Sequence, residues 1–459
     1  MTPSPVLNPG PVSAPIADHP AFDFERAEGG VEAYRHRANG LTVLFLLDPA
    51  GEAAPPVAAF QVTYRVGSRN EGAGLTGATH LLEHLMFKGS ERFNRELGTG
   101  VFQVLQSVGG QINATTWYDR TNYYAVLPED QLHLAVAVEA DRMRGARVRD
   151  EDLASERTVV LNELDRGENE PLRKLLHAVY STAFQAHPYG HPVIGWRSDV
   201  ETVTAAGLRH FYDTYYWPSR ATASVAGKFD RRTVLDLLDE HFGGIPPGPE
   251  ADEDAPTPLV HRDADEAVTR EPEQRGMRRT TVKMAGELGA VLLAYKAPAG
   301  LTETADALDV LVQVLTAGKS SRLFRRLTDR GLTTSAFAYY PRLRDPGLFI
   351  LYGALAPDVE PATVETELKA ALLSVAEEGI TEAELARARR QVIADEAYGR
   401  DGPQAVISQL NEAISVGDWT LFSHYRERIE AVTREAVQAA AAAIAEDDRL
   451  TVGEYLPVG

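Results

Sequence analysis

The sequence predicts an α+β protein built from two duplicated domains, each an antiparallel-rich sheet packed with helices. Three observations support this. Strand-like runs come in pairs and precede long segments of helical periodicity. This order of elements occurs in both halves of the chain, and a stretch rich in Pro, Asp and Glu separates the halves. One order of elements used twice favours two related domains that face each other.

The first half carries the expected elements in a simple order. Two strands lead into a helix around residue 80, a second strand pair follows, long helices come next, and a final strand closes the half. The strands are expected at 41–47, 58–66, 111–116, 121–126 and 221–226, and the long helices at 131–143 and 153–182.

The second half repeats this rhythm. Strands are expected at 280–284, 290–295, 334–340 and 348–354, and helices at 302–315, 320–327, 361–377 and 382–398. With 459 residues, of which 44% are hydrophobic, the chain is long enough for two buried cores. We therefore expect a flexible, proline-rich lead-in at 1–21, a first domain at 22–245, a linker at 246–275 and a second domain at 276–459.

Composition excludes several classes of function. The formal net charge of -20 argues against a nucleic-acid-binding protein, which needs clustered Lys and Arg. No apolar run is long enough to cross a membrane. The first residues lack the pattern of a signal peptide, so a cytoplasmic bacterial protein is the default expectation, and a periplasmic one if a signal was removed. The chain has no cysteine, so a metal would have to be held by His, Asp or Glu.

The most informative motif is His80-Leu81-Leu82-Glu83-His84. Two histidines four residues apart lie on one face of a helix and can share a metal ion. Imidazole nitrogens suit zinc, and a carboxylate beside them, here Glu83, can take a proton from zinc-bound water. This order, HxxEH, is the inverzincin signature. A solvated helix that carries these residues by chance is the alternative interpretation.

A catalytic zinc site usually needs a third protein ligand. Glu156 and Glu163 are seven residues apart, two helical turns, and so share a helix face. Asp150, Glu151 and Asp152 just before them suit a helix N-terminus. Glu163 would be the ligand, and Glu156 would assist catalysis from behind by a hydrogen bond to a ligand or to the base. Two glutamates on a simply solvated face are the alternative.

With these motifs the chain resembles the pitrilysin/insulinase family of zinc metallopeptidases, and within it the processing-peptidase-like members. In that family HxxEH is followed by a helix with two glutamates seven residues apart, the second of which binds zinc. Further resemblance lies in the segments GGQINATTWYDRTNYYAVLP, HPYGHPVIGWRSDVETVT, FYDTYYWPSRATASVAGKFD, SSRLFRRL and DPGLFIL. The family fold places the two domains around a cavity.

The resemblance implies an endopeptidase with one Zn²⁺ per chain, held by His80, His84 and Glu163. Glu83 would activate the zinc-bound water. The strand with Asn113 and Ala114 would bind extended peptides or unfolded proteins through its backbone.

One departure bears on partners. Active members of the family carry an Arg and a Tyr in the second domain. In this chain the position of the Arg is Thr328 or is deleted, and the position of the Tyr is Thr334. The resemblance therefore implies a heterodimer with a sister subunit that lacks HxxEH and supplies the Arg/Tyr pair. A homodimer that works without the pair is less favoured. The alternative function is a non-catalytic structural or peptide-holding member of the same family.

Overall fold

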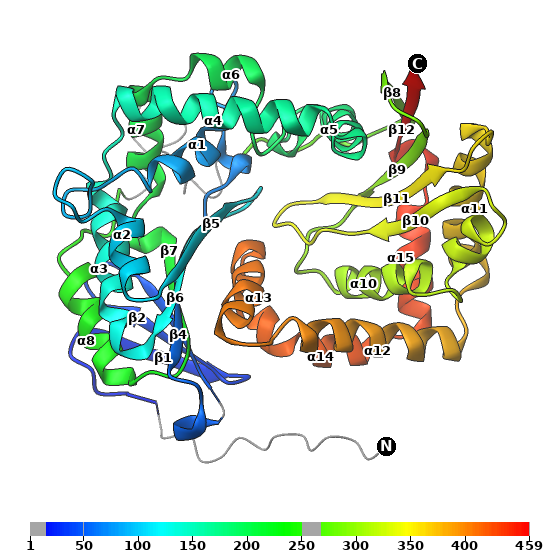
Figure 1. Ribbon diagram of the computed structural model, residues 1–459. Helices are drawn as coiled ribbons and strands as arrows, with labels where there is room; N and C mark the ends of the chain where they lie inside the picture. The colour runs from blue at the N-terminus through cyan, green and yellow to red at the C-terminus, as the bar shows by residue number, and fades with distance from the viewer. Residues whose placement is uncertain (1–14, 49, 250–267, 459) are drawn as a thin grey trace. The chain divides into compact units, whose positions relative to one another are not determined.

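The structure is a computed structural model that describes residues 15–48, 50–249 and 268–458 (Figure 1). Its contacts divide the chain into two compact units. Unit 1 comprises Met1–Val159, Val193–Ala267 and Gly399–Ser415, and unit 2 comprises Val160–Pro192, Val268–Tyr398 and Val416–Gly459. The units interleave along the chain, whereas the predicted domains are consecutive. The predicted domain boundaries remain a prediction, and most of the predicted linker and lead-in lies outside the described residues.

Unit 1 is built on a seven-stranded sheet of order β1-β2-β3-β7-β4-β6-β5, in which only the β3–β7 pair is parallel. Its central strands β4 and β7 are almost wholly buried, as expected for strands covered on both faces. The strands are β1 Phe22–Glu28, β2 Val31–His36, β3 Thr42–Leu47, β4 Val57–Tyr64, β5 Gln111–Thr116, β6 Thr121–Pro128 and β7 Ala221–Gly227.

The helices of unit 1 come from the first half of the chain, with one exception. They are α1 Ala78–Leu85, α2 Val101–Ser107, α3 Leu132–Gly145, α6 Arg197–Thr202, α7 Ala205–Tyr215 and α8 Arg231–Phe242. The exception is α13, Pro403–Val416, orange in Figure 1, which packs on unit 1 although it lies far along the chain. The sequence did not predict α13, β1 or β2.

Unit 2 contains a five-stranded sheet of order β10-β11-β9-β12-β8, again with a single parallel pair, β12–β8. Leucine, valine and alanine side chains from its sheet and helices form one buried core. The strands are β8 Arg278–Ala285, β9 Ala290–Ala297, β10 Thr333–Tyr339, β11 Gly347–Leu355 and β12 Leu450–Val458; the helices are α5 Pro171–Ala183, α10 Glu303–Thr316, α11 Pro361–Glu378, α12 Glu382–Tyr398, α14 Thr420–Ala431 and α15 Arg434–Ile444. The prediction of two duplicated, antiparallel-rich α+β domains is confirmed.

Two predicted helices differ from the observed ones. The single helix expected at 153–182 is two helices, α4 Asp150–Glu168 and α5, because Pro171 lacks the N–H needed to continue the first and instead opens the second. The segment expected as a helix at 320–327 includes a short π-helix, Phe324–Thr328. The predicted N-terminal acids Asp150, Glu151 and Asp152 do lie in the first turn of α4. No helix of the described residues has the length and apolarity to cross a membrane.

Candidate metal centre

Helix α1 carries the HxxEH motif and is preceded by a residue in the left-handed backbone conformation. Its N-cap is Gly77, with φ of 84°, and a side chain there would meet the carbonyl oxygen of Ile194 at 2.5 Å. The side chain of Glu71 takes the place of an ordinary cap. Its two oxygens accept the N–H groups of Gly77 and Thr79 at 2.8 and 2.7 Å. Glu71 thereby fixes the start of the helix from which the motif projects.

Burial of Glu71 has an electrostatic cost. Burial raises the pKa of its carboxyl to about 8, and the hydrogen bonds from Thr79 and Gly77 lower it only in part. The nearby negative charge of Asp199 adds to the rise. Asp199 itself accepts hydrogen bonds from the N–H and the hydroxyl of Thr76, at 3.2 and 2.7 Å.

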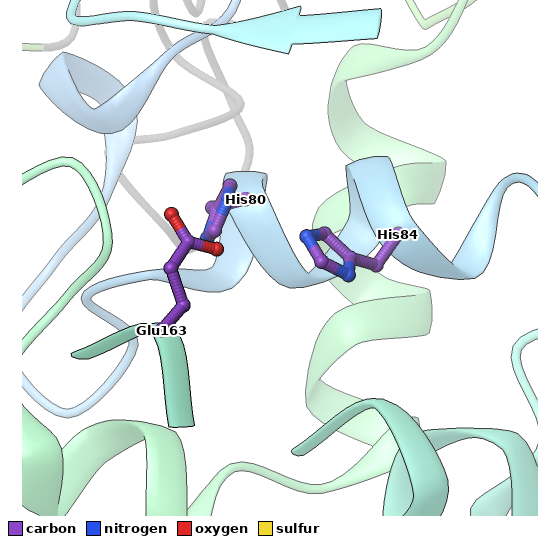
Figure 2. A group of neighbouring side chains, drawn as sticks. All are labelled: His80, His84 and Glu163. Atoms are coloured by element: carbon purple, nitrogen blue, oxygen red, sulfur yellow. The ribbon is translucent and has the colours of Figure 1, made fainter. Parts of the chain in front are cut away.

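His80, His84 and Glu163 lie together, as Figure 2 shows, with their side chains directed at one another. One potential ligand atom from each lies within 4.8 Å of the other two, and all three side chains are partly exposed. The histidines come from α1 and the glutamate from α4. Among the residues that the structure describes, this is the one group of three or more such side chains that could hold a metal ion.

Glu156, two turns before Glu163 on the same continuous helix, holds His84 from behind. Its Oε2 lies 2.8 Å from His84 Nδ1, and its other oxygen pairs with Lys88. Burial raises the pKa of Glu156, but the hydrogen bonds from Lys88 and His84 outweigh it, so the pKa is lowered. A carboxylate at Nδ1 leaves Nε2 of His84 available as a ligand and sets the tautomer. The contact is with the candidate ligand His84, which is one of the two arrangements that the sequence left open.

Glu83 lies on the same helix and is tied to the sheet. The hydroxyl of Thr116, the last residue of β5, donates to Glu83 Oε2 at 2.6 Å. This short bond to a carboxylate fixes the direction of the side chain.

Strand β5 is the edge of the unit 1 sheet, paired on one side only, with β6. Asn113 is exposed and Ala114 is buried on it, and the Asn113 side chain accepts the N–H of Ala114 at 2.9 Å. An edge strand presents unpaired backbone groups along its free side. The predicted substrate-binding pair therefore lies on a strand with a free edge, and the same strand ends at Thr116, which holds Glu83.

The residues present fit a zinc ion. Two imidazoles and one carboxylate form a donor set typical of catalytic zinc sites, which keep a further position open. A carboxylate behind one histidine is the usual support of such a set.

The positions matched to the Arg and Tyr of the family lie in unit 2. Thr328 ends the π-helix, with its hydroxyl 3.2 Å from that of Thr333, and Thr334 is exposed on β10. The nearby Arg330 is bound to Glu367 at 2.7 Å.

Comparison with known proteins agrees with this geometry. Two family models match the chain: one described as Insulinase (Peptidase family M16) over residues 52–196, and one described as Peptidase M16 inactive domain over residues 202–392. The chain is 33% identical to an uncharacterized zinc protease of Mycobacterium leprae, over 90% of this chain and 92% of that protein. The chain belongs to peptidase family M16. This is the pitrilysin/insulinase family that the motifs indicated.

Two further proteases are similar to the chain. The zinc protease PqqE of Helicobacter pylori is 33% identical, over 71% of this chain and 70% of its own length. The crystal structure of a protease from Helicobacter pylori superposes with a TM-score of 0.84 at 27% identity, covering 94% of this chain and 100% of that one.

Sequence reasoning about this M16 site missed three contributors: Glu71, Lys88 and Thr116. For two of these residues, the sequence spacing could have indicated the role. Thr116 lies two residues after Ala114, on the same strand face, and Lys88 lies four residues after His84. The role of Glu71 had no such signal, since only the folded turn between it and α1 brings its carboxylate to the N–H groups of the helix.

Proposed function

We propose that this chain is the zinc-bearing subunit of a metalloendopeptidase that cleaves extended peptides. One observation supports the proposal most strongly. Ligand atoms of His80, His84 and Glu163 lie within 4.8 Å of one another, on the helix that also carries Glu83 and on the helix that carries Glu156.

His80, His84 and Glu163 would hold one Zn²⁺ per chain, and Glu156 with Lys88 would orient His84. When bound, the ion would supply a Lewis acid that polarises the scissile carbonyl and makes water a stronger acid.

Glu83 would be the general base. Its carboxylate would accept the proton of the attacking water and then give it to the leaving amine. Thr116 donates to one oxygen of Glu83, which orients the other for proton transfer.

The free edge of β5 would bind the substrate. A peptide in extended conformation can add to an edge strand by main-chain hydrogen bonds. Asn113 and Ala114 would lie beside the bound backbone, three and two residues before Thr116, which holds the base. Such binding selects for an extended, unfolded segment more than for particular side chains.

A partner would complete the site. Thr328 and Thr334 offer neither a guanidinium nor a phenol, so a sister subunit without HxxEH would contribute the Arg/Tyr pair. A homodimer that works without the pair is the second arrangement. The missing pair, together with the match of residues 202–392 to a family model described as an inactive domain, also favours a second candidate function, that of a non-catalytic peptide-holding member.

The test combines zinc analysis with peptide cleavage by the purified chain, alone and mixed with a sister subunit. One zinc per chain, with cleavage only in the mixture, supports the split site. One zinc with full activity of the chain alone supports the homodimer, and absence of zinc supports the non-catalytic role. Glu83→Gln separates metal binding from chemistry: it should retain zinc and lose cleavage by about a thousandfold or more. Activity within a few-fold of wild type would contradict the role of Glu83 as base.

A further inference from the structure

Helix α13 contributes a polar face to unit 1. Its residues bind three side chains on strands β4 and β6, deep in the sheet. Thr63 donates to Asn411 Oδ1 at 2.7 Å, the Asn411 amide donates to Asn122 Oδ1 at 3.3 Å, and Gln61 donates to the carbonyl oxygen of Ile407 at 3.3 Å. These residues are buried. The helix is thus fixed to the sheet by directional bonds as well as by packing.

One ion pair extends this contact to the turn between β5 and β6. Arg120, just before β6, donates through Nε to Glu412 of α13 at 3.1 Å, and its Nη2 binds the same oxygen. Its Nη1 donates to the Thr115 hydroxyl at 2.6 Å and to Asn122 Oδ1 at 2.8 Å. Arg120 is only 11% exposed, whereas Glu412 is 57% exposed. A single guanidinium therefore joins α13 to both strands of the β5–β6 hairpin.

The two faces of β5 bind different partners. Side chains alternate along a strand, so Thr115 and Thr116 point to opposite faces. Thr115 binds Arg120 and Asn122 on one face. Thr116 binds Glu83 on the other. The position of β5 relative to Glu83 thus depends on what holds the strand at Thr115.

We propose that Arg120 and Glu412 are positioning residues, which hold edge strand β5 so that Thr116 orients Glu83 and the strand aligns the bound peptide. This rests on the proposed function above. A helix encoded near residue 400 would then be part of the catalytic apparatus of the first half of the chain. Neither residue touches the reacting atoms; both act through the strand.

The experiment measures kcat, KM and zinc content for Arg120→Met, Glu412→Ala and the double variant, in the complex in which wild type is active. A strand misplaced by about an ångström should lower kcat roughly tenfold for Glu412→Ala and up to about a hundredfold for Arg120→Met. The double variant should be no worse than Arg120→Met, because Glu412 acts through Arg120. Arg120→Lys, which can reach Glu412 but cannot bind Thr115 and Asn122 at once, should recover only part of the loss.

The matched control is Asp23→Asn. Asp23 lies on β1, at the opposite edge of the same sheet, and pairs with Arg37 at 2.9 Å. This variant should keep wild-type kcat. Zinc content should stay at the wild-type value in all variants, which separates positioning from unfolding. Loss of zinc and kcat together, or equal kcat in Glu412→Ala and Asp23→Asn, would overturn the proposal.

A second readout does not depend on peptidase activity. Amide hydrogen exchange of 111–128 should be faster in Glu412→Ala and Arg120→Met than in wild type and Asp23→Asn. If the wild-type chain cleaves no peptide under any condition, the proposed function fails, and exchange alone decides whether α13 holds β5. Unchanged exchange would then overturn the positioning role as well.

Discussion

The sheets of the two units share one arrangement of five strands. In unit 1 the order β3-β7-β4-β6-β5 forms the main part of the sheet, and unit 2 repeats it as β8-β12-β9-β11-β10. In each, the first two strands form the only parallel pair, and the last is a free edge. Unit 1 adds β1 and β2 beyond this common part. The two units therefore share one sheet topology over five strands.

The functional side chains on the corresponding helices of the two units differ. In chain order, the second of the five shared strands is β4 in unit 1 and β9 in unit 2. The next α-helix in the chain is α1 after β4 and α10 after β9. Helix α1 directs His80 and His84 at Glu163. Helix α10 instead carries Asp306 and Asp309, which bind Arg342. Corresponding helices thus carry two candidate metal ligands in unit 1 and a structural ion-pair network in unit 2, which is why function has to be argued from side chains.

The largest expected effect lies at the three candidate metal ligands, His80, His84 and Glu163. Glu163→Gln should lower peptide cleavage by about a thousandfold or more, because the site loses its one anionic ligand. Zinc analysis after dialysis against a weak chelator should show loss of metal. Asp309→Asn, the matched change of an acid on α10, should leave zinc content at the wild-type value. Retained zinc in Glu163→Gln would remove Glu163 from the ligand set.

The next effect concerns the stability of unit 2. Arg342 donates to Asp309 at 2.8 Å and to the carbonyl oxygen of Gly300 at 2.9 Å, and Tyr425 donates to Asp309 at 2.7 Å. Arg342→Met would leave the buried carboxylate of Asp306 and the largely buried carboxylate of Asp309 without this cation. A loss of about 3–5 kcal/mol in the free energy of unfolding is expected, measured by urea denaturation.

An exposed ion pair provides the control for that change. Arg426 pairs with Glu430 on the surface of α14. Arg426→Met should change stability by less than about 1 kcal/mol. Equal losses for Arg342→Met and Arg426→Met would show that the network of α10 is not what stabilises unit 2.

A smaller effect is expected behind the ligands. Glu156→Gln would keep the size of the side chain but lose the charge that pairs with Lys88 and supports His84. Zinc affinity should fall about 10–100-fold, the usual range for such supporting residues. Competition with a metal-sensitive dye measures it. Wild-type affinity in Glu156→Gln would mean that α4 acts on the site through Glu163 alone.

The last comparison is a difference in pH dependence between two glutamates. In unit 1 the pKa of Glu71 is raised to about 8, chiefly by burial. The folded chain then keeps a proton that the unfolded chain has lost, so this group lowers stability as pH rises from its ordinary value of 4.5 toward 8. In unit 2 burial also raises the pKa of Glu384, but hydrogen bonds from Arg322 and Thr381 outweigh it and lower it to about 2. That contribution is present above pH 4.5 and is lost as pH falls toward 2.

Urea denaturation at a series of pH values separates the two groups. Glu71→Gln should flatten the stability profile between about pH 4.5 and 8, and Glu384→Gln should flatten it below about pH 4.5. Profiles that stay parallel to wild type in both windows would contradict these assignments.

Much of the fold followed from local pattern. The strand pairs and the helices at 361–377 and 382–398 were predicted within a few residues, because alternation and helical periodicity are encoded locally. The break of the long helix at Pro171 could also have been read from the sequence. Helix α13 could not be assigned to unit 1, because its partners Gln61, Thr63 and Asn122 are hundreds of residues away.

The sequence by itself determined the kind of chemistry this protein can support. The spacing within HxxEH and between Glu156 and Glu163 is periodic, so helix geometry alone puts each pair on one face. The tertiary structure decided which distant elements come into contact. It places Glu163 beside the histidines, Thr116 against Glu83, and α13 against the β5–β6 hairpin. Contacts between distant segments depend on how whole elements pack, and no local pattern encodes that packing.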